Sequence, residues 1–164
     1  MVITLEAGDV APDFELPDQD GTMRSLGDYA GRNLVLYFYP KDFTPGWTTE
    51  ACALRDEYAK IQAAGATIVG VSPDTSEKHK AFREEYDLPF DLLADTEHVA
   101  AEAYGAWGER SMYGKTFMGI FRSTFLIGPD ANLLKVWKKV TPDEAGTDIL
   151  SALEAWWNLH YTGL

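Results

Sequence analysis

LVLYFYPKDFTPGWTTEAC, residues 34–52, carries the clearest structural signals in the chain. Its first part, Leu34–Tyr39, is a continuous apolar run rich in aromatic and β-branched residues, which predicts a buried strand that stops at Pro40. After a turn, apolar residues recur at helical spacing, so the sequence predicts a helix over Trp47–Ala64 that Gly65 closes. The stretch is therefore a buried strand, a turn and a helix in direct succession.

Outward from this unit, predicted strands and helices alternate along the chain. The other predicted strands are Phe14–Leu16, Thr22–Leu26, Thr67–Val71, Phe90–Ala94, Ser123–Ile127 and Leu133–Trp137. The other predicted helices are Ser76–Asp87, about Glu97 to Tyr104, and a last helix that Pro142 opens and that runs to about Trp157. Strands separated by helices predict parallel pairing, and the first and last strand pairs predict antiparallel hairpins. We expect one α/β domain over residues 1–164, with an N-terminal β-hairpin and a mixed central sheet flanked by helices on both faces.

The charge balance excludes several kinds of partner. The chain has 26 acidic and 14 basic residues, for a formal net charge of −12, which repels nucleic acids and anionic membranes.

No segment reaches the ~18 uninterrupted apolar residues of a transmembrane helix, and the acidic N-terminus does not suit a signal peptide. Cys52 is the single cysteine, so no internal disulfide can form, which fits a reducing compartment such as the cytoplasm.

The turn between the predicted strand and helix has the features of an anion site. Thr44 suits the N-cap and Pro45 the first helical position, so the free amides of Gly46 and Trp47 would point out of the first helical turn. Together with the helix dipole, these amides favour a bound anion, and a cysteine placed there would lose its proton easily. Thr44 could add a hydroxyl, and Arg122, which directly precedes a predicted strand, could add a guanidinium.

The same turn resembles that of the peroxiredoxins. Their motif is Pro-x-x-x-Thr/Ser-x-x-Cys, and this chain has Pro40-Lys41-Asp42-Phe43-Thr44-Pro45-Gly46-Trp47, which matches every fixed position except the last. The flanks, among them TTEACALRDEY, VGVSPDTSEKHKAF and FRSTFLIGPD, are similar to those of the bacterioferritin-comigratory or PrxQ branch. The resemblance covers about residues 3–157 and implies a thioredoxin-like fold.

The resemblance also implies a reaction and roles for particular residues. Members of the family reduce hydrogen peroxide and organic hydroperoxides without a cofactor or metal, and thioredoxin or a similar thiol reductant recycles them. By position, Pro40 would shield the reactive atom, Thr44 would bind the peroxide, and Arg122 would stabilise the thiolate and the developing oxyanion. Glu50 would orient that arginine, and Cys52 matches the resolving cysteine. The branch is expected to be monomeric or weakly dimeric.

Trp47 departs from this pattern at the attacking atom. An indole has no thiol, and its N–H only donates hydrogen bonds, so it cannot displace a hydroxyl group from a peroxide. Its bulk must either plug the pocket or swing out and disturb the turn. Cys52 is a poor substitute, because five residues along a helix are about 7.5 Å of rise and about 140° of rotation. We expect little or no peroxidase activity from this chain.

Several simpler interpretations stay open at this stage. Thr44 alone is an ordinary N-cap, Arg122 an ordinary surface ion-pair partner, Glu50 a favourable first-turn carboxylate, and Cys52 a small core residue. The chain itself is an altered enzyme, a non-catalytic binding or structural relative with the same fold, or a redox protein that works through Cys52. Its scattered histidines show no metal-ligand spacing, and no G-x-G-x-x-G motif predicts a dinucleotide.

Overall fold

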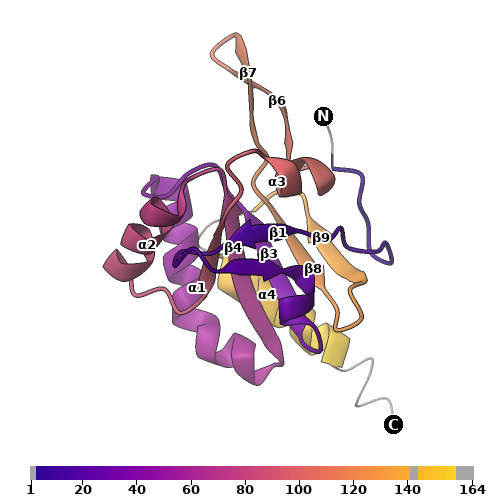
Figure 1. The fold of residues 1–164 in the computed structure, drawn as a ribbon. Helices are drawn as coiled ribbons and strands as arrows, with labels where there is room; N and C mark the ends of the chain where they lie inside the picture. The colour runs from indigo at the N-terminus through magenta and orange to yellow at the C-terminus, as the bar shows by residue number, and fades with distance from the viewer. Residues whose placement is uncertain (1–2, 141–143, 158–164) are drawn as a thin grey trace.

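The computed structural model describes residues 3–140 and 144–157, which form a layered α/β structure (Figure 1). The strands are β1 Glu15–Pro17, β2 Met23–Ser25, β3 Asn33–Phe38, β4 Ala66–Ser72, β5 Asp91–Ala94, β6 Trp107–Met112, β7 Lys115–Ile120, β8 Ser123–Ile127 and β9 Leu133–Trp137. The helices are the 3₁₀ helix η1 Leu26–Tyr29 and the α-helices α1 Pro45–Ala63, α2 Ser76–Glu85, α3 Val99–Ala103 and α4 Ala145–Trp157.

The central sheet has the strand order β5-β4-β3-β8-β9. Strand β3 pairs in parallel with β4, and β4 pairs in parallel with β5, because a helix separates each of these strands from the next. Strand β8 pairs antiparallel with both β3 and β9. The prediction of a mixed central sheet is therefore confirmed, and so is the N-terminal hairpin, in which β1 and β2 pair antiparallel.

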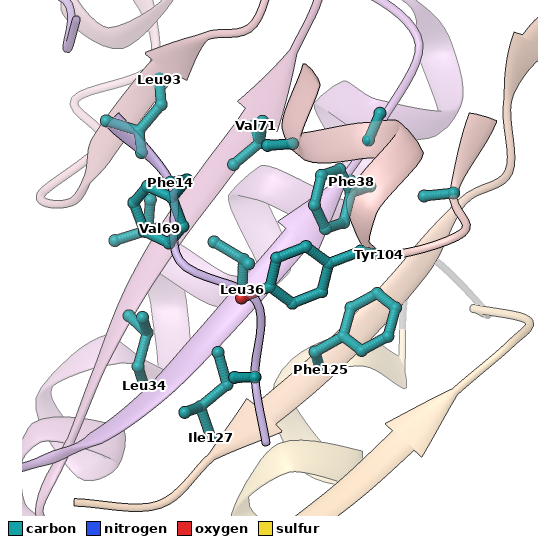
Figure 2. Close-up of a cluster of buried hydrophobic side chains, with 14 of the residues drawn as sticks. Phe14, Leu34, Leu36, Phe38, Val69, Val71, Leu93, Tyr104, Phe125 and Ile127 are labelled. Atoms are coloured by element: carbon teal, nitrogen blue, oxygen red, sulfur yellow. The ribbon is translucent and has the colours of Figure 1, made fainter. Parts of the chain in front are cut away.

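Strand β3 lies at the centre of the sheet and alternates its side chains between two hydrophobic cores. Leu34, Leu36 and Phe38 enter a core that α3 and the N-terminal segment cover, and Figure 2 shows these side chains gathered with Tyr104 and Phe125. The residues between them point into the second core, beneath α1, α2 and α4. Helices thus cover both faces of the sheet, as predicted. The second core lies under α1, the helix that follows the turn after β3.

Two elements differ from the sequence-based prediction. The sequence pattern predicts no element over residues 107–120, whereas β6 and β7 form a hairpin that projects from the body (Figure 1). Met112 pairs with Lys115 across a two-residue loop, and both loop residues, Tyr113 and Gly114, have positive φ. Such a loop follows the strand twist, and its glycine was the available signal. The helix expected from Glu97 to Tyr104 is limited to α3.

The remaining boundaries agree with prediction to within a few residues. Helix α1 begins at Pro45 with Thr44 as N-cap, as expected, and ends at Ala63. Pro142, which we expected to open the last helix, lies outside the described residues, and α4 is described from Ala145. None of the helices in the described part of the chain has the length and apolar character that a membrane span requires.

Candidate functional site

The strand register brings Arg122 to the turn that leads into α1. Antiparallel pairing between β3 and β8 places Phe38, the last residue of β3, opposite Ser123. Arg122 directly precedes Ser123, so it lies at the end of the sheet where the chain leaves β3 for α1. Two segments that are far apart in the sequence are therefore adjacent in the fold, at the carboxyl end of the parallel strands.

Arg122 lies directly against Gly46 in the first turn of α1. A Cβ built on Gly46 would lie 2.8 Å from each terminal nitrogen of the Arg122 guanidinium, a distance that real Cβ atoms do not tolerate. Glycine is required here because it lets the guanidinium approach the backbone closely. The cation and the amide groups that begin the helix thus meet at one place, and both favour an anion.

Glu50 lies beneath this arginine, one helical turn further along α1. Its side chain is 1% exposed, and its Oε2 is 3.8 Å from Nη1 of Arg122. Neither of these two atoms has a hydrogen-bond partner among the described residues. Burial raises the pKa of Glu50 from 4.5 to about 8, and the Arg122 charge opposes this rise only in part. At neutral pH the carboxyl is thus mostly protonated, so Glu50 offsets little of the positive charge of Arg122.

Trp47 is turned into the core and is fully buried. Its indole stacks on the ring of Tyr39, with centroids 3.8 Å apart, and a second ring, Phe82, lies 6.3 Å away. Gly70 in β4 leaves room for this pair, since a Cβ there would lie 3.1 Å from the Tyr39 ring and 3.5 Å from the indole. The indole Nε1 is buried with no hydrogen-bond partner in the described part of the chain.

This packing decides between the two expectations for Trp47. The indole neither swings out nor disturbs the turn, because α1 starts in regular fashion at Pro45, and it fills space beneath the first helical turn. Trp47 therefore packs an aromatic surface against the core and provides no nucleophilic atom at the start of α1.

The other predicted site residues lie at the same turn or further along α1. Thr44 is half-buried, and its Oγ1 donates a hydrogen bond of 2.9 Å to the carbonyl of Lys41, without capping the helix by its side chain. Pro40 is half-buried just after β3. Cys52 is a free, half-buried thiol within the unbroken helix α1, which places it about 140° around the axis from Trp47.

Comparison with known proteins identifies the family. A family model described as the AhpC/TSA family matches residues 7–136. This chain belongs to that family. The Peroxiredoxin Bcp of Bacillus subtilis (strain 168) is 48% identical over 152 residues, which cover 93% of this chain and 97% of the relative. The Peroxiredoxin Bcp of Escherichia coli (strain K12) is 47% identical over 133 residues, which cover 81% and 85%.

Solved structures agree with this membership. Peroxiredoxin Q of Xanthomonas campestris matches with a TM-score of 0.82 at 38% identity, over 87% of this chain and 90% of that one. The BcpB peroxidoxin of Mycobacterium tuberculosis matches with a TM-score of 0.82 at 36% identity, over 92% and 97%. The expected Bcp/PrxQ branch of the peroxiredoxins, the thioredoxin-like fold and the thiol peroxidase class of this family are therefore confirmed.

A buried polar network, which the sequence analysis missed, holds the turn of this peroxiredoxin. Asp42 accepts hydrogen bonds from the Tyr39 hydroxyl, at 2.7 Å, and at its second oxygen from Nδ1 of His79, at 2.5 Å. The other ring nitrogen of His79 faces the Leu93 carbonyl at 3.0 Å. Both ring nitrogens of His79 thus have an oxygen partner within hydrogen-bond distance.

This network connects the turn after β3 to α2 and β5, and its buried hydrogen bonds hold the turn in place. The available signal was the spacing of His79 and Phe82 on one face of α2, both of which are buried. The sequence alone gives His79 no metal-ligand spacing and indicates no other role for it. No group of three or more residues able to hold a metal ion occurs in residues 3–140 and 144–157.

Proposed function

We propose that this chain keeps the hydroperoxide site of a Bcp-type peroxiredoxin but cannot complete peroxide reduction. In the family reaction a thiolate attacks one peroxide oxygen, the O–O bond breaks, water or an alcohol leaves, and a sulfenic acid remains. The reaction needs sulfur at the start of α1. The observation that carries the proposal is that position 47 there holds a buried indole, while Arg122 lies against Gly46.

Each remaining site residue receives a role from its place around this turn. Arg122 and the Gly46 amide would stabilise negative charge on the peroxide oxygens, and the Thr44 hydroxyl would orient the peroxide. Glu50 would position Arg122 from below, which its 3.8 Å separation supports. Pro40 would shield the reacting atoms from water. Cys52 would be the resolving thiol of an active form, and the first turn of α1 would have to unwind for it to act.

The partners follow from the same family membership. The substrate class is hydrogen peroxide and organic hydroperoxides, and the reductant of an active form is thioredoxin or a similar dithiol. The proposed oligomeric state is a monomer or weak dimer, as the resemblance to this branch suggests. The proposed compartment is the cytoplasm, because the single cysteine cannot make an internal disulfide, which fits a reducing environment.

A second candidate is a non-catalytic binding or structural relative. The fit of the indole against Tyr39 and above Gly70 favours it, because a large side chain imposed on a pocket built for a thiol would meet clashes rather than a stacked partner. Restoring the thiol separates the two candidates, since only an otherwise intact peroxidase gains activity from one substitution.

The test is peroxide consumption with thioredoxin or dithiothreitol as reductant. The chain, Trp47→Cys and Trp47→Ser are compared after circular dichroism verifies that each is folded, because the serine variant leaves a similar void without a thiol. We expect Trp47→Cys to exceed both others by at least about a thousandfold, as removal of a nucleophile costs up to ~10⁶ in kcat. Rapid turnover by the unsubstituted chain, or no gain in folded Trp47→Cys, would contradict the proposal.

A further inference from the structure

A second feature beside Arg122 is a cleft lined mainly by cations. It has a volume of about 370 Å³, and its lining residues are Arg110, Phe121, Arg122, Lys138, Lys139 and Val140. Four of these six residues are basic and none is acidic, in a chain where acidic residues outnumber basic ones by 26 to 14. We call this feature the cationic cleft.

The fold gathers these cations from three segments. Thr124 of β8 pairs with Trp137 of β9, so the antiparallel register carried two positions outward brings Arg122 toward Lys139 and its neighbour Lys138. Arg110 comes from β6 in the projecting hairpin, and its Nη1 donates a hydrogen bond of 2.8 Å to a backbone carbonyl near the base of that hairpin. Strand pairing and the hydrogen bond of the Arg110 guanidinium thus bring the four basic side chains to one cleft.

Three of the four basic side chains in the cationic cleft have no ion-pair partner among the described residues. Within residues 3–140 and 144–157, no ion pair within 4.0 Å involves Arg110, Lys138 or Lys139. The acidic neighbour of Arg122 is Glu50, whose buried carboxyl is mostly protonated at neutral pH because its pKa is raised to about 8. Four like charges around one recess repel one another, and an anion in their midst would remove that repulsion.

We infer that the cationic cleft binds a small molecule that carries two or more negative charges on phosphate or carboxylate groups. The volume lies within the range of about 300–1,000 Å³ that small-molecule sites occupy. Phe121 and Val140 add an apolar wall for the body of such a molecule. Guanidinium groups bind both oxyanions with paired hydrogen bonds, so the shared chemistry is a compact polyanion.

The net charge of the protein selects against larger polyanions. A nucleic acid, an acidic protein or an anionic membrane would lie against much of a surface whose formal charge is −12, and repulsion over that area opposes binding. A small anion within the cleft is dominated by the cations around it, because salt screens charges beyond about 8–10 Å. Residue 47 does not line the cationic cleft, so anion binding there needs no peroxide chemistry.

The test is isothermal titration calorimetry of the chain at an ionic strength of about 0.1 M, where the Debye length is about 10 Å, with inorganic pyrophosphate and, separately, citrate. The test variant is Lys138→Gln/Lys139→Gln. The control is Lys60→Gln/Lys80→Gln, which changes the net charge equally at exposed positions on α1 and α2. Neither lysine of the test pair is buried, so folding is expected to survive, and circular dichroism checks it. Arg110→Gln provides a second, independent change in the lining.

We expect saturable binding of one anion per chain. The Kd rises by about tenfold or more in Lys138→Gln/Lys139→Gln and in Arg110→Gln, and changes less than about twofold in the control. Binding of pyrophosphate alone assigns phosphate compounds, and binding of citrate alone assigns carboxylates. Absence of saturable binding of both probes, or equal weakening in the test and control variants, would overturn the inference.

Discussion

The indole of Trp47 lies face to face with the ring of Tyr39, with ring centroids 3.8 Å apart and ring planes 12° from parallel. This stack joins the first turn of α1 to the end of the central strand. It places a large aromatic surface at the position that we propose for the nucleophile of an active form, where stability and catalysis would compete at one residue.

Truncation of Trp47 should therefore destabilise the fold strongly. We expect Trp47→Ala to lower the free energy of unfolding by about 3–5 kcal/mol, because a fully buried aromatic side chain leaves a cavity. Urea unfolding followed by circular dichroism measures the loss. Tyr113→Ala is the control, because Tyr113 is 97% exposed and its truncation should change stability by no more than about 0.5 kcal/mol. Equal losses in the two variants would contradict the packing described above.

Gly46 should tolerate no side chain. We expect Gly46→Ala in the Trp47→Cys background to reduce peroxide consumption by at least about tenfold, because its Cβ would displace the Arg122 guanidinium that lies 2.8 Å away. Gly27→Ala is the matched control, since a Cβ there meets only the Ser25 hydroxyl oxygen at 3.7 Å, an ordinary contact. Full activity in Gly46→Ala would show that the arginine does not act from this position.

Glu50 should make stability fall as pH rises. Its pKa is raised from 4.5 to about 8 in the folded state, so between these values the folded chain holds a proton that the unfolded chain has lost. This contribution is complete below pH 4.5 and is lost as pH rises toward 8, with a slope of at most about 1.4 kcal/mol per pH unit. Unfolding by urea at several pH values should therefore show a flatter profile in Glu50→Gln than in the parent chain. Parallel profiles of unfolding free energy against pH in the two chains would refute the raised pKa of Glu50.

The Asp42–His79 pair should be strongly coupled. We expect His79→Leu to cost about 3–5 kcal/mol of unfolding free energy, because it leaves a buried carboxylate without its partner. Asp42→Asn in the same chain should restore part of that loss, and a double-mutant cycle on the two positions gives the coupling energy. Strict additivity of the two losses would mean that the network does not hold the turn as a unit.

The comparison of sequence and structure shows which features local pattern can predict. The approach of Arg122 to the turn that leads into α1 was an expectation from the peroxiredoxin resemblance and from the strand that follows Arg122, and the β3–β8 register provides it. The direction of the Trp47 side chain could not be predicted from the sequence, because it depends on the space that Gly70 leaves on a different strand. Spacing along one helix carries no information about such space.

Two other features depended on distant contacts. His79 occurs in a charged surface helix, and its burial follows from Asp42, which reaches it from the turn after β3. The cationic cleft required the β6–β7 hairpin, which the alternation of strands and helices did not reveal. Lys138 and Arg110 are far apart in the sequence, and only sheet pairing brings them to one recess.

The most direct test of the central claim is to locate the sulfur that peroxide oxidises. Trp47→Cys/Cys52→Ser and the unsubstituted chain are each exposed to a stoichiometric amount of hydrogen peroxide with dimedone, and peptide mass spectrometry finds the labelled residue. We expect rapid sulfenic acid labelling at position 47 of the variant and almost none at Cys52 of the unsubstituted chain. Labelling of Cys52 at a comparable rate would contradict it.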